Sequence, residues 1–197
     1  MNIINKTYRW ANGLSKRKST QYIIIHHAAA STLSPDQVHQ LHLNNGWAGF
    51  GYHFYVRKDG SVFTGRPIDY VGAHTTNYNS VSVGICFEGN FETETMSAAQ
   101  KQAGKELVQY LKTKYPKAQV KKHKDFNATA CPGKKLPFDE ISKGTPTTQV
   151  LESVNDIVWE LNHRGIITNK ELWLKKLEED KNAYWLAYKC ANMTKNK

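Results

Sequence analysis

Two histidines and one cysteine stand out as side chains that could bind a metal ion together. His26 ends a run of β-branched residues, His123 ends a short strand that is expected to begin at Val120, and Cys131 follows eight residues later in a loop. Zinc binds imidazole nitrogen and thiolate sulfur, and three protein ligands leave a fourth position open for water. Such an ion activates water and polarises a carbonyl, which is hydrolytic chemistry. Spacing alone leaves a second interpretation open, in which Cys131 is a small buried apolar side chain.

These side chains need a scaffold that brings distant parts of the chain together. Residues 22–25 predict a buried central strand that leads directly into His26. Five further elements are predicted from caps, turn signals and periodicity. The first is a helix from Pro35 to about Asn45, capped by Ser34, and the second is a hairpin of 53–56 and 62–65 around Asp59-Gly60. A strand over 81–88 and a helix from Ser97 that ends before Pro116 follow. The last is a strand from Val120 to His123. A turn of helix is also expected at 137–141.

The composition and the hydrophobic periodicity of the sequence change after residue 142. Residues 143–149 have the composition of a linker, and residues 150–197 show only helical periodicity. The sequence therefore predicts a main domain over 1–142 and a small all-helical domain over 150–197. About 47 residues are marginal for an independent fold, so we expect this segment to bind a partner, dock or self-associate.

Composition narrows the classes of protein that fit. The chain of 197 residues is 40% hydrophobic, which excludes a wholly disordered protein. No stretch approaches the roughly 18 apolar residues of a membrane span, and the start lacks the apolar core of a signal peptide. Three cysteines are too few for a disulfide framework, which favours synthesis in a reducing cytosol.

Positive charge is concentrated in the first three-quarters of the chain. Of the net charge of +10, residues 151–197 carry 8 basic against 7 acidic side chains, which leaves +9 for residues 1–150. Such a field attracts an anionic polymer, whether nucleic acid, cell wall or membrane surface. Nucleic acid is disfavoured because the chain has no glycine-rich phosphate loop, no zinc-finger spacing and no aromatic RNA-binding strand motif.

Several short motifs, taken in order along the chain, resemble those of a known protein family. They are Ile25-His26-His27-Ala28, Gly51-Tyr52-His53-Phe54, Arg57-Lys58-Asp59-Gly60, Gly72-Ala73-His74, Ser82-Val83-Gly84-Ile85, and His123-Lys124-Asp125 with Cys131-Pro132-Gly133. Over about residues 20–140 the chain resembles the zinc-dependent N-acetylmuramoyl-L-alanine amidases, a family that includes phage lysozymes and peptidoglycan recognition proteins. The whole chain resembles an endolysin from a bacteriophage of a Gram-positive host. The resemblance implies an α/β fold with a central mixed β-sheet flanked by helices on both faces.

The same resemblance implies roles for individual residues. The zinc ligands are His26, His123 and Cys131, and Tyr52 is expected beside the metal as a catalytic residue. Two further residues are candidates for the remaining catalytic role, and the alternatives stay open. One is Thr129, two positions before Cys131. The other is Glu88: some relatives carry a catalytic glutamate at the position of Cys86, and Glu88 follows two residues later on the same face of the strand.

Other histidines and polar residues near these motifs also have expected roles. His74 and Asn79 lie on a loop of the kind that lines the substrate groove in relatives, so we expect them to bind substrate. His27 and His53 alternate away from their neighbours and are expected to serve the fold. Asp125 either orients His123 or caps a turn.

The implied activity is hydrolysis of the amide bond between N-acetylmuramic acid and L-alanine in peptidoglycan. The expected partner is a Gram-positive cell wall, reached after synthesis in the host cytoplasm and release, with no membrane insertion. The alternative function is a peptidoglycan-binding module without catalysis, in which the cysteine ligand is typically replaced. Cys131 is present here, which favours the enzyme. A muropeptide-recycling amidase would share the chemistry, but the extra helical segment favours whole-wall binding.

Overall fold

The computed structural model divides the chain into two compact units, Met1–Thr145 and Pro146–Lys197. It describes residues 3–144 and, beyond them, residues 158, 161–162, 167–169, 171–173 and 175. The predicted linker and all-helical domain lie almost entirely outside the described residues. Among those described, Leu172 donates its backbone N–H to the side-chain oxygen of Asn169, 3.0 Å away, at the start of a helical turn.

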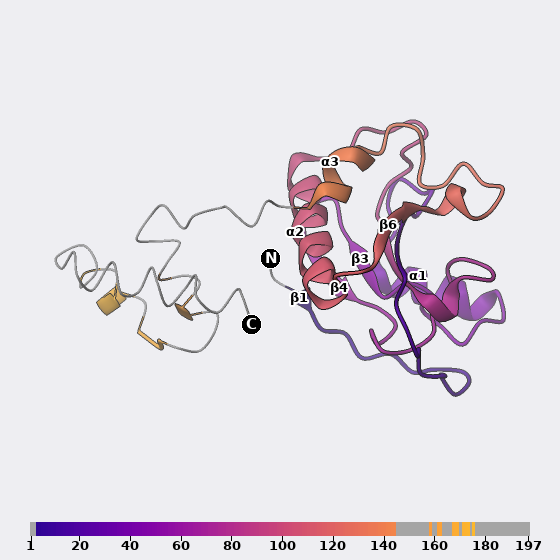
Figure 1. The fold of residues 1–197 in the computed structure, drawn as a ribbon, viewed down its shortest axis with the longest axis horizontal. Coiled ribbons are helices and arrows are strands. Elements are labelled where there is room, and N and C mark those ends of the chain that lie inside the picture. The colour runs from indigo at the N-terminus through magenta and orange to yellow at the C-terminus, as the bar shows by residue number, and fades with distance from the viewer. Residues whose placement is uncertain are drawn as a thin grey trace. The chain divides into compact units, whose positions relative to one another are not determined.

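Unit 1 is built on one mixed sheet of six strands in the order β1-β4-β3-β5-β2-β6. Figure 1 labels β1, β3, β4 and β6 of this sheet. Strand β2 lies between β5 and β6 and is parallel to both, while β3 is parallel to β5 and antiparallel to β4. The strands are β1 (Ile3–Ile4), β2 (Tyr22–His27), β3 (Phe54–Val56), β4 (Val62–Thr64), β5 (Ser82–Phe87) and β6 (Gln119–Lys122). The helices are α1 (Pro35–Asn44), η1 (Asn79–Val81), α2 (Ala98–Lys114), η2 (His123–Asp125) and α3 (Phe138–Lys143).

Local sequence signals explain where these elements begin and turn. Ser34 caps α1 by accepting the N–H of Gln37, whose side chain accepts the N–H of Ser34 in return. Gly60 has a φ of 86°, which suits glycine at the tight turn between β3 and β4. Ser97 caps α2, which ends one residue before Tyr115. The predicted strands, hairpin and helices of this unit are therefore confirmed, whereas β1 was not predicted.

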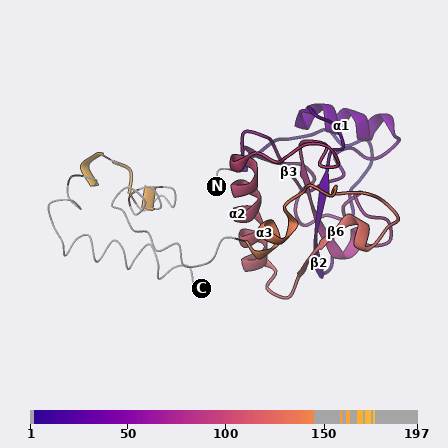
Figure 2. The same ribbon diagram turned by 90° about the horizontal axis from the view of Figure 1, so that it is seen from above.

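The helices cover the two faces of the sheet unequally. Helices α2 and α3 lie on one side and α1 on the other, as the two views show (Figures 1 and 2). On the α2 side, buried aliphatic and aromatic side chains of the sheet and both helices form the main core. On the α1 side, Val38 packs with Phe50, Tyr55 and Cys86 in a smaller cluster. No helix in the described part of the chain is long and apolar enough to cross a membrane.

Candidate metal centre

The three predicted ligands lie together at one edge of the sheet. His26 is near the carboxyl end of β2, and His123 follows directly after β6, its parallel neighbour. Because neighbouring parallel strands end at the same edge, residues 97 positions apart in the chain become adjacent. The loop after η2 then brings Cys131 back, and one ligand atom from each residue lies within 4.8 Å of the others.

Hydrogen bonds indicate which ring nitrogens face the metal position. His26 Nδ1 lies 3.7 Å from Cys131 Sγ, whereas its Nε2 lies 3.0 Å from His74 Nδ1. His123 Nε2 lies 3.1 Å from Asn127 Oδ1, which leaves its Nδ1 available. Bond lengths near 2.0–2.3 Å at tetrahedral angles place two ligand atoms about 3.5 Å apart. The separation of 3.7 Å between His26 and Cys131 therefore fits a shared ion.

Burial has opposite consequences for the imidazole and the thiol of the ligand set. His26 is 1% exposed, and desolvation, followed by the nearby His123, holds its pKa well below the usual histidine value. The imidazole is therefore neutral and can offer a lone pair. Burial raises the pKa of the Cys131 thiol to about 11 in the absence of an ion. A bound cation would replace that proton, so metal uptake is expected to release protons.

The loop that carries Cys131 is held by its backbone. Lys124 N–H donates to the Cys131 carbonyl at 3.0 Å, which ties the loop back to η2. Gly133 has a φ of 93°, and a Cβ at this position would lie 2.5 Å from the backbone carbon of Phe91. Only glycine fits there without a shift. The Cys-Pro-Gly motif thus fixes the sulfur relative to the two histidines.

Tyr52 lies beside the cluster, as predicted from the motif order. Its ring centroid is 5.1 Å from that of His26 and 5.4 Å from that of His42 on α1. Burial, followed by the neighbouring thiols of Cys86 and Cys131, raises the pKa of the Tyr52 hydroxyl well above 10. The hydroxyl therefore keeps its proton at neutral pH and can donate a hydrogen bond.

The two candidates for the remaining catalytic role have different surroundings. Thr129 is exposed, and its hydroxyl accepts the backbone N–H of Cys131 at 3.2 Å. Glu88 is 1% exposed and forms an ion pair with Arg57 at 3.0 Å. Its carboxylate also accepts the backbone N–H groups of Leu33 and Lys58, both at 3.1 Å. Burial alone would raise the pKa of Glu88, but these hydrogen bonds outweigh it and lower the pKa.

His74 and Asn79 do not lie as expected for residues of an open groove. His74 is 7% exposed, and its ring packs against His26 with the centroids 5.0 Å apart. The side-chain oxygen of Asn79 accepts the backbone N–H groups of His74 and Thr75, at 2.7 and 2.9 Å. Asn79 thus shapes the loop on which His74 stands.

The histidines expected to serve the fold have structural partners. His27 Nδ1 accepts the backbone N–H of Phe91 at 3.1 Å, and His53 Nδ1 accepts that of Gly84 at 3.0 Å. Asp125 accepts the N–H of Lys122, which favours the turn-capping alternative. Sequence reasoning missed Asn127 as the partner of His123, although a spacing of four residues in a turn could have suggested it.

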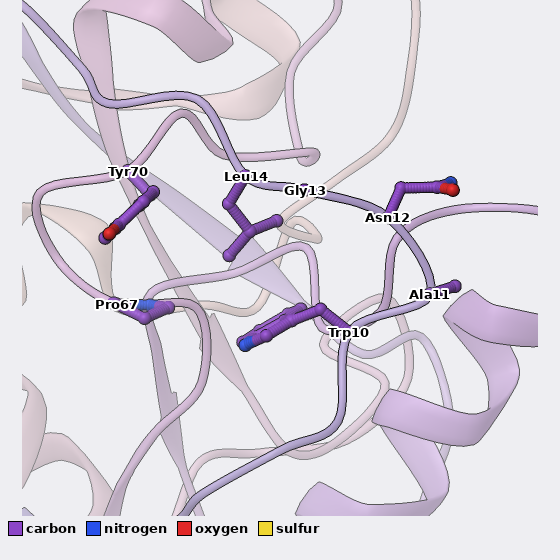
Figure 3. Close-up of a pocket in the computed structure, with 7 residues that line it drawn as sticks. All are labelled: Trp10, Ala11, Asn12, Gly13, Leu14, Pro67 and Tyr70. Atoms are coloured by element: carbon purple, nitrogen blue, oxygen red, sulfur yellow. The ribbon is translucent and has the colours of Figure 1, made fainter.

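A shallow surface pocket lies elsewhere on the unit (Figure 3). It has a volume of about 570 Å³, and its lining comes from the N-terminal segment and the loop after β4. The lining residues are Trp10, Ala11, Asn12, Gly13, Leu14, Pro67 and Tyr70. None of them is a predicted site residue, so the chemistry is assigned to the metal cluster.

Comparison with known proteins agrees with this geometry. The family model described as N-acetylmuramoyl-L-alanine amidase matches residues 16–134. An endolysin of Klebsiella phage KP32 is 36% identical over 126 residues, which cover 60% of this chain and 83% of the endolysin. Peptidoglycan-recognition protein SC2 of Drosophila melanogaster is 35% identical over 57% of this chain and 67% of its own. The solved N-acetylmuramoyl-L-alanine amidase LysC from Clostridium intestinale URNW has a TM-score of 0.70 and 39% identity, over 72% of this chain and 95% of LysC. The chain therefore belongs to the N-acetylmuramoyl-L-alanine amidase family and is a peptidoglycan hydrolase.

Proposed function

We propose that this amidase is zinc-dependent and that its ligands are His26, His123 and Cys131. The observation that carries the proposal is the convergence of two imidazoles and one thiol within 4.8 Å. This donor set suits zinc, and three protein ligands leave one position open, as in hydrolytic rather than structural zinc sites. Zinc in such a site supplies a Lewis acid for the scissile carbonyl and activates water as a nucleophile near neutral pH.

Tyr52 is the residue placed to stabilise negative charge on the substrate. Tyr52 is partly buried beside His26, and its protonated hydroxyl can donate a hydrogen bond to the carbonyl oxygen as the carbonyl is attacked. Donors fixed in advance in a site with little water stabilise such an oxyanion strongly, because they need not reorient during the reaction. The carbonyl is the lactyl carbonyl of N-acetylmuramic acid, and the leaving group is the amine of L-alanine.

Thr129 suits the second catalytic role better than Glu88. The Thr129 hydroxyl accepts one hydrogen bond from Cys131 and keeps its own O–H for donation toward the substrate. The Glu88 carboxylate is already used by Arg57 and two backbone amides, and its lowered pKa disfavours proton uptake. We therefore assign Glu88 to holding the segments around Leu33 and Lys58.

The biological setting follows from the relatives. Endolysins of Klebsiella phage KP32 and Escherichia phage T7 are similar to this chain, so we place the protein in phage-induced lysis of a bacterial host. The net charge of +9 on residues 1–150 suits a wall rich in anionic polymers, such as that of Gram-positive bacteria. We retain residues 143–149 as a linker and 150–197 as a segment for wall binding or self-association.

End-group analysis of digested cell walls tests the proposal. Purified Gram-positive and Gram-negative walls are incubated with the protein, with a chelator, and with zinc restored after chelation. The expected result is new N-terminal alanine without new reducing sugar ends, lost on chelation and regained with zinc. Tight co-sedimentation with walls and no new ends would instead favour a recognition module. New reducing ends would show that a different bond is cut.

A further inference from the structure

We propose that His74 is a positioning residue for the metal centre, fixing the orientation of His26 so that Nδ1 faces the ion. The inference rests on the proposed function, because it takes His26 as a ligand. It replaces the sequence-based expectation that His74 binds substrate. A chain of hydrogen bonds leads from His26 away from the metal position.

The chain begins at the ring nitrogen of His26 that the metal does not need. His26 Nε2 lies 3.0 Å from His74 Nδ1, and Thr75 Oγ1 lies within 2.9 Å of that Nδ1 and 3.3 Å of the same Nε2. On the far side of the ring, His74 Nε2 lies 3.4 Å from Ser82 Oγ. The Ser82 hydroxyl in turn donates to the Tyr78 carbonyl at 2.7 Å.

One assignment of protons is consistent with the contacts that join His26, His74 and Ser82. When Nδ1 of His26 binds a metal ion, the single proton of that neutral ring is on Nε2 and must be donated. His74 Nδ1 accepts it, which places the proton of His74 on Nε2, where Ser82 Oγ accepts it. Ser82 then donates to a backbone carbonyl, which needs no proton of its own. Hydrogen-bonded partners of this kind fix the tautomer and the ring orientation of a metal-binding histidine.

The ring of His74 has no room to leave this position. A Cβ at Gly72 would lie 2.4 Å from His74 Cδ2, and a Cβ at Gly84 would lie 2.6 Å from its Cγ. Gly72 in the loop before η1 and Gly84 on β5 therefore hold the ring between their backbones. Asn79 fixes the backbone at His74 from a third direction. Gly72, Gly84 and Asn79 together therefore fix the position of the His74 imidazole, which is 7% exposed.

A pair of variants of the same shape separates hydrogen bonding from packing. His74→Asn places an amide oxygen on Cγ, where Nδ1 stands, and keeps an acceptor for His26. His74→Leu has the same branched arrangement of side-chain heavy atoms as Asn but offers no acceptor. Binding of Co²⁺ and of Zn²⁺ to the full chain is measured by competition with a chelator. Loss of a partner of a metal-bound histidine typically weakens binding by about 10–100-fold. We expect that loss for Leu and binding within about threefold of the wild type for Asn.

A matched control comes from a second buried histidine. His42 is 5% exposed and its Nδ1 also accepts a hydrogen bond, from Gly51 N–H at 2.9 Å. Its ring packs against Trp47, Phe50 and Tyr52, none of which is a ligand residue. His42→Leu is therefore expected to lower stability without weakening metal binding. Equal affinities for the Asn and Leu variants of His74 would overturn the inference. So would a loss of metal affinity in His42→Leu as large as that in His74→Leu.

Nitrogen NMR of the histidine rings gives a readout that packing alone would not move. In the zinc-loaded wild type, His74 is expected to show a protonated Nε2 and an unprotonated Nδ1; a protonated Nδ1 would refute the assignment. Different outcomes contradict the zinc site and the amidase mechanism. A wild-type protein that binds neither metal contradicts the zinc site itself, whereas a protein that binds metal but releases no N-terminal alanine contradicts only the amidase mechanism.

Discussion

The two faces of the sheet have different tasks, and strand β2 shows the division most directly. Ile23 and Ile25 point into the apolar core under α2 and α3, and His27 is on the same side, bonded to Phe91 of that core. His26, one residue away, points to the other face, among Tyr52, His74 and Cys131. The α2 face thus supplies stability and the α1 face supplies chemistry. Substitutions on one face should leave the property of the other nearly unchanged.

The largest expected effect follows from removing the sulfur ligand. Cys131→Ser should abolish stoichiometric metal binding and lower activity by at least about three orders of magnitude, since metal-ion catalysis supplies several kcal/mol. The melting temperature of the metal-free protein should change little, because Cys131 belongs to a loop outside the core. Metal analysis, wall digestion and thermal denaturation measure the three properties. As control, Cys86→Ala removes a buried thiol on the same face and should retain metal.

Tyr52→Phe should come next in size and should separate binding from catalysis. Loss of one fixed donor to an oxyanion typically costs about 10²–10³ in kcat. Because Tyr52 is not a ligand, metal affinity is expected to stay at the wild-type value. Rates of wall digestion and chelator competition on the same preparation check both statements. An unchanged rate would remove Tyr52 from the mechanism, and a lost metal ion would reassign it to holding the site.

Leu107→Ala tests the opposite face. Leu107 is fully buried in the core under α2, so the truncation should lower the free energy of unfolding by about 2–5 kcal/mol. At a temperature where the variant stays folded, its metal affinity and rate should match the wild type. Denaturant unfolding gives the stability. Leu41→Ala is the control: Leu41 is 47% exposed, and its truncation should cost within about 0.5 kcal/mol. A loss of metal affinity in Leu107→Ala would show that the two faces are coupled.

The sequence was sufficient where the signals are local. The β-branched run of β2, the cap at Ser34 and the turn at Gly60 each act within a few residues, and each prediction is confirmed. Strand β1 was missed because Ile3–Ile4 is ordered by pairing with β4, which is about 60 residues away, and two residues carry no periodicity.

Long-range contacts explain what the sequence could not show about the site. Alternation along β5 places Glu88 on the side of Cys86, yet its availability depends on Arg57, 31 residues away. His74 follows a glycine on a loop, which suggests an exposed residue. Its burial depends on the space that Gly84 leaves on a neighbouring strand. Motif order located the ligands, but only the fold assigns their partners.

Acid should lower the stability of the fold, and His42 should contribute to this loss. Burial, followed by Arg66 and His39, lowers the pKa of His42 to about 4, from an ordinary value of 6.5. The unfolded chain therefore binds the proton first, so the free energy of unfolding falls as the pH drops from 6.5 to 4. A shift of this size corresponds to about 3 kcal/mol for His42 alone. Urea unfolding across this range should be less pH-dependent in His42→Asn. An equal dependence would exclude His42 as the group that titrates.

Thr129→Val should give the smallest fall in activity of these variants, with almost no change in stability. The change keeps the β-branched shape and removes only the hydroxyl, which accepts the Cys131 N–H and is free to donate toward the substrate. Loss of one hydrogen bond of this kind is worth about 1 kcal/mol, so we expect a fall in kcat of roughly fivefold to tenfold. The free energy of unfolding should change by less than about 0.5 kcal/mol, because Thr129 is exposed. Should kcat stay constant while metal affinity falls, the hydroxyl would serve only to shape the loop before Cys131. Thr129 would then have a structural role, although it lies two residues from a metal ligand on the catalytic face.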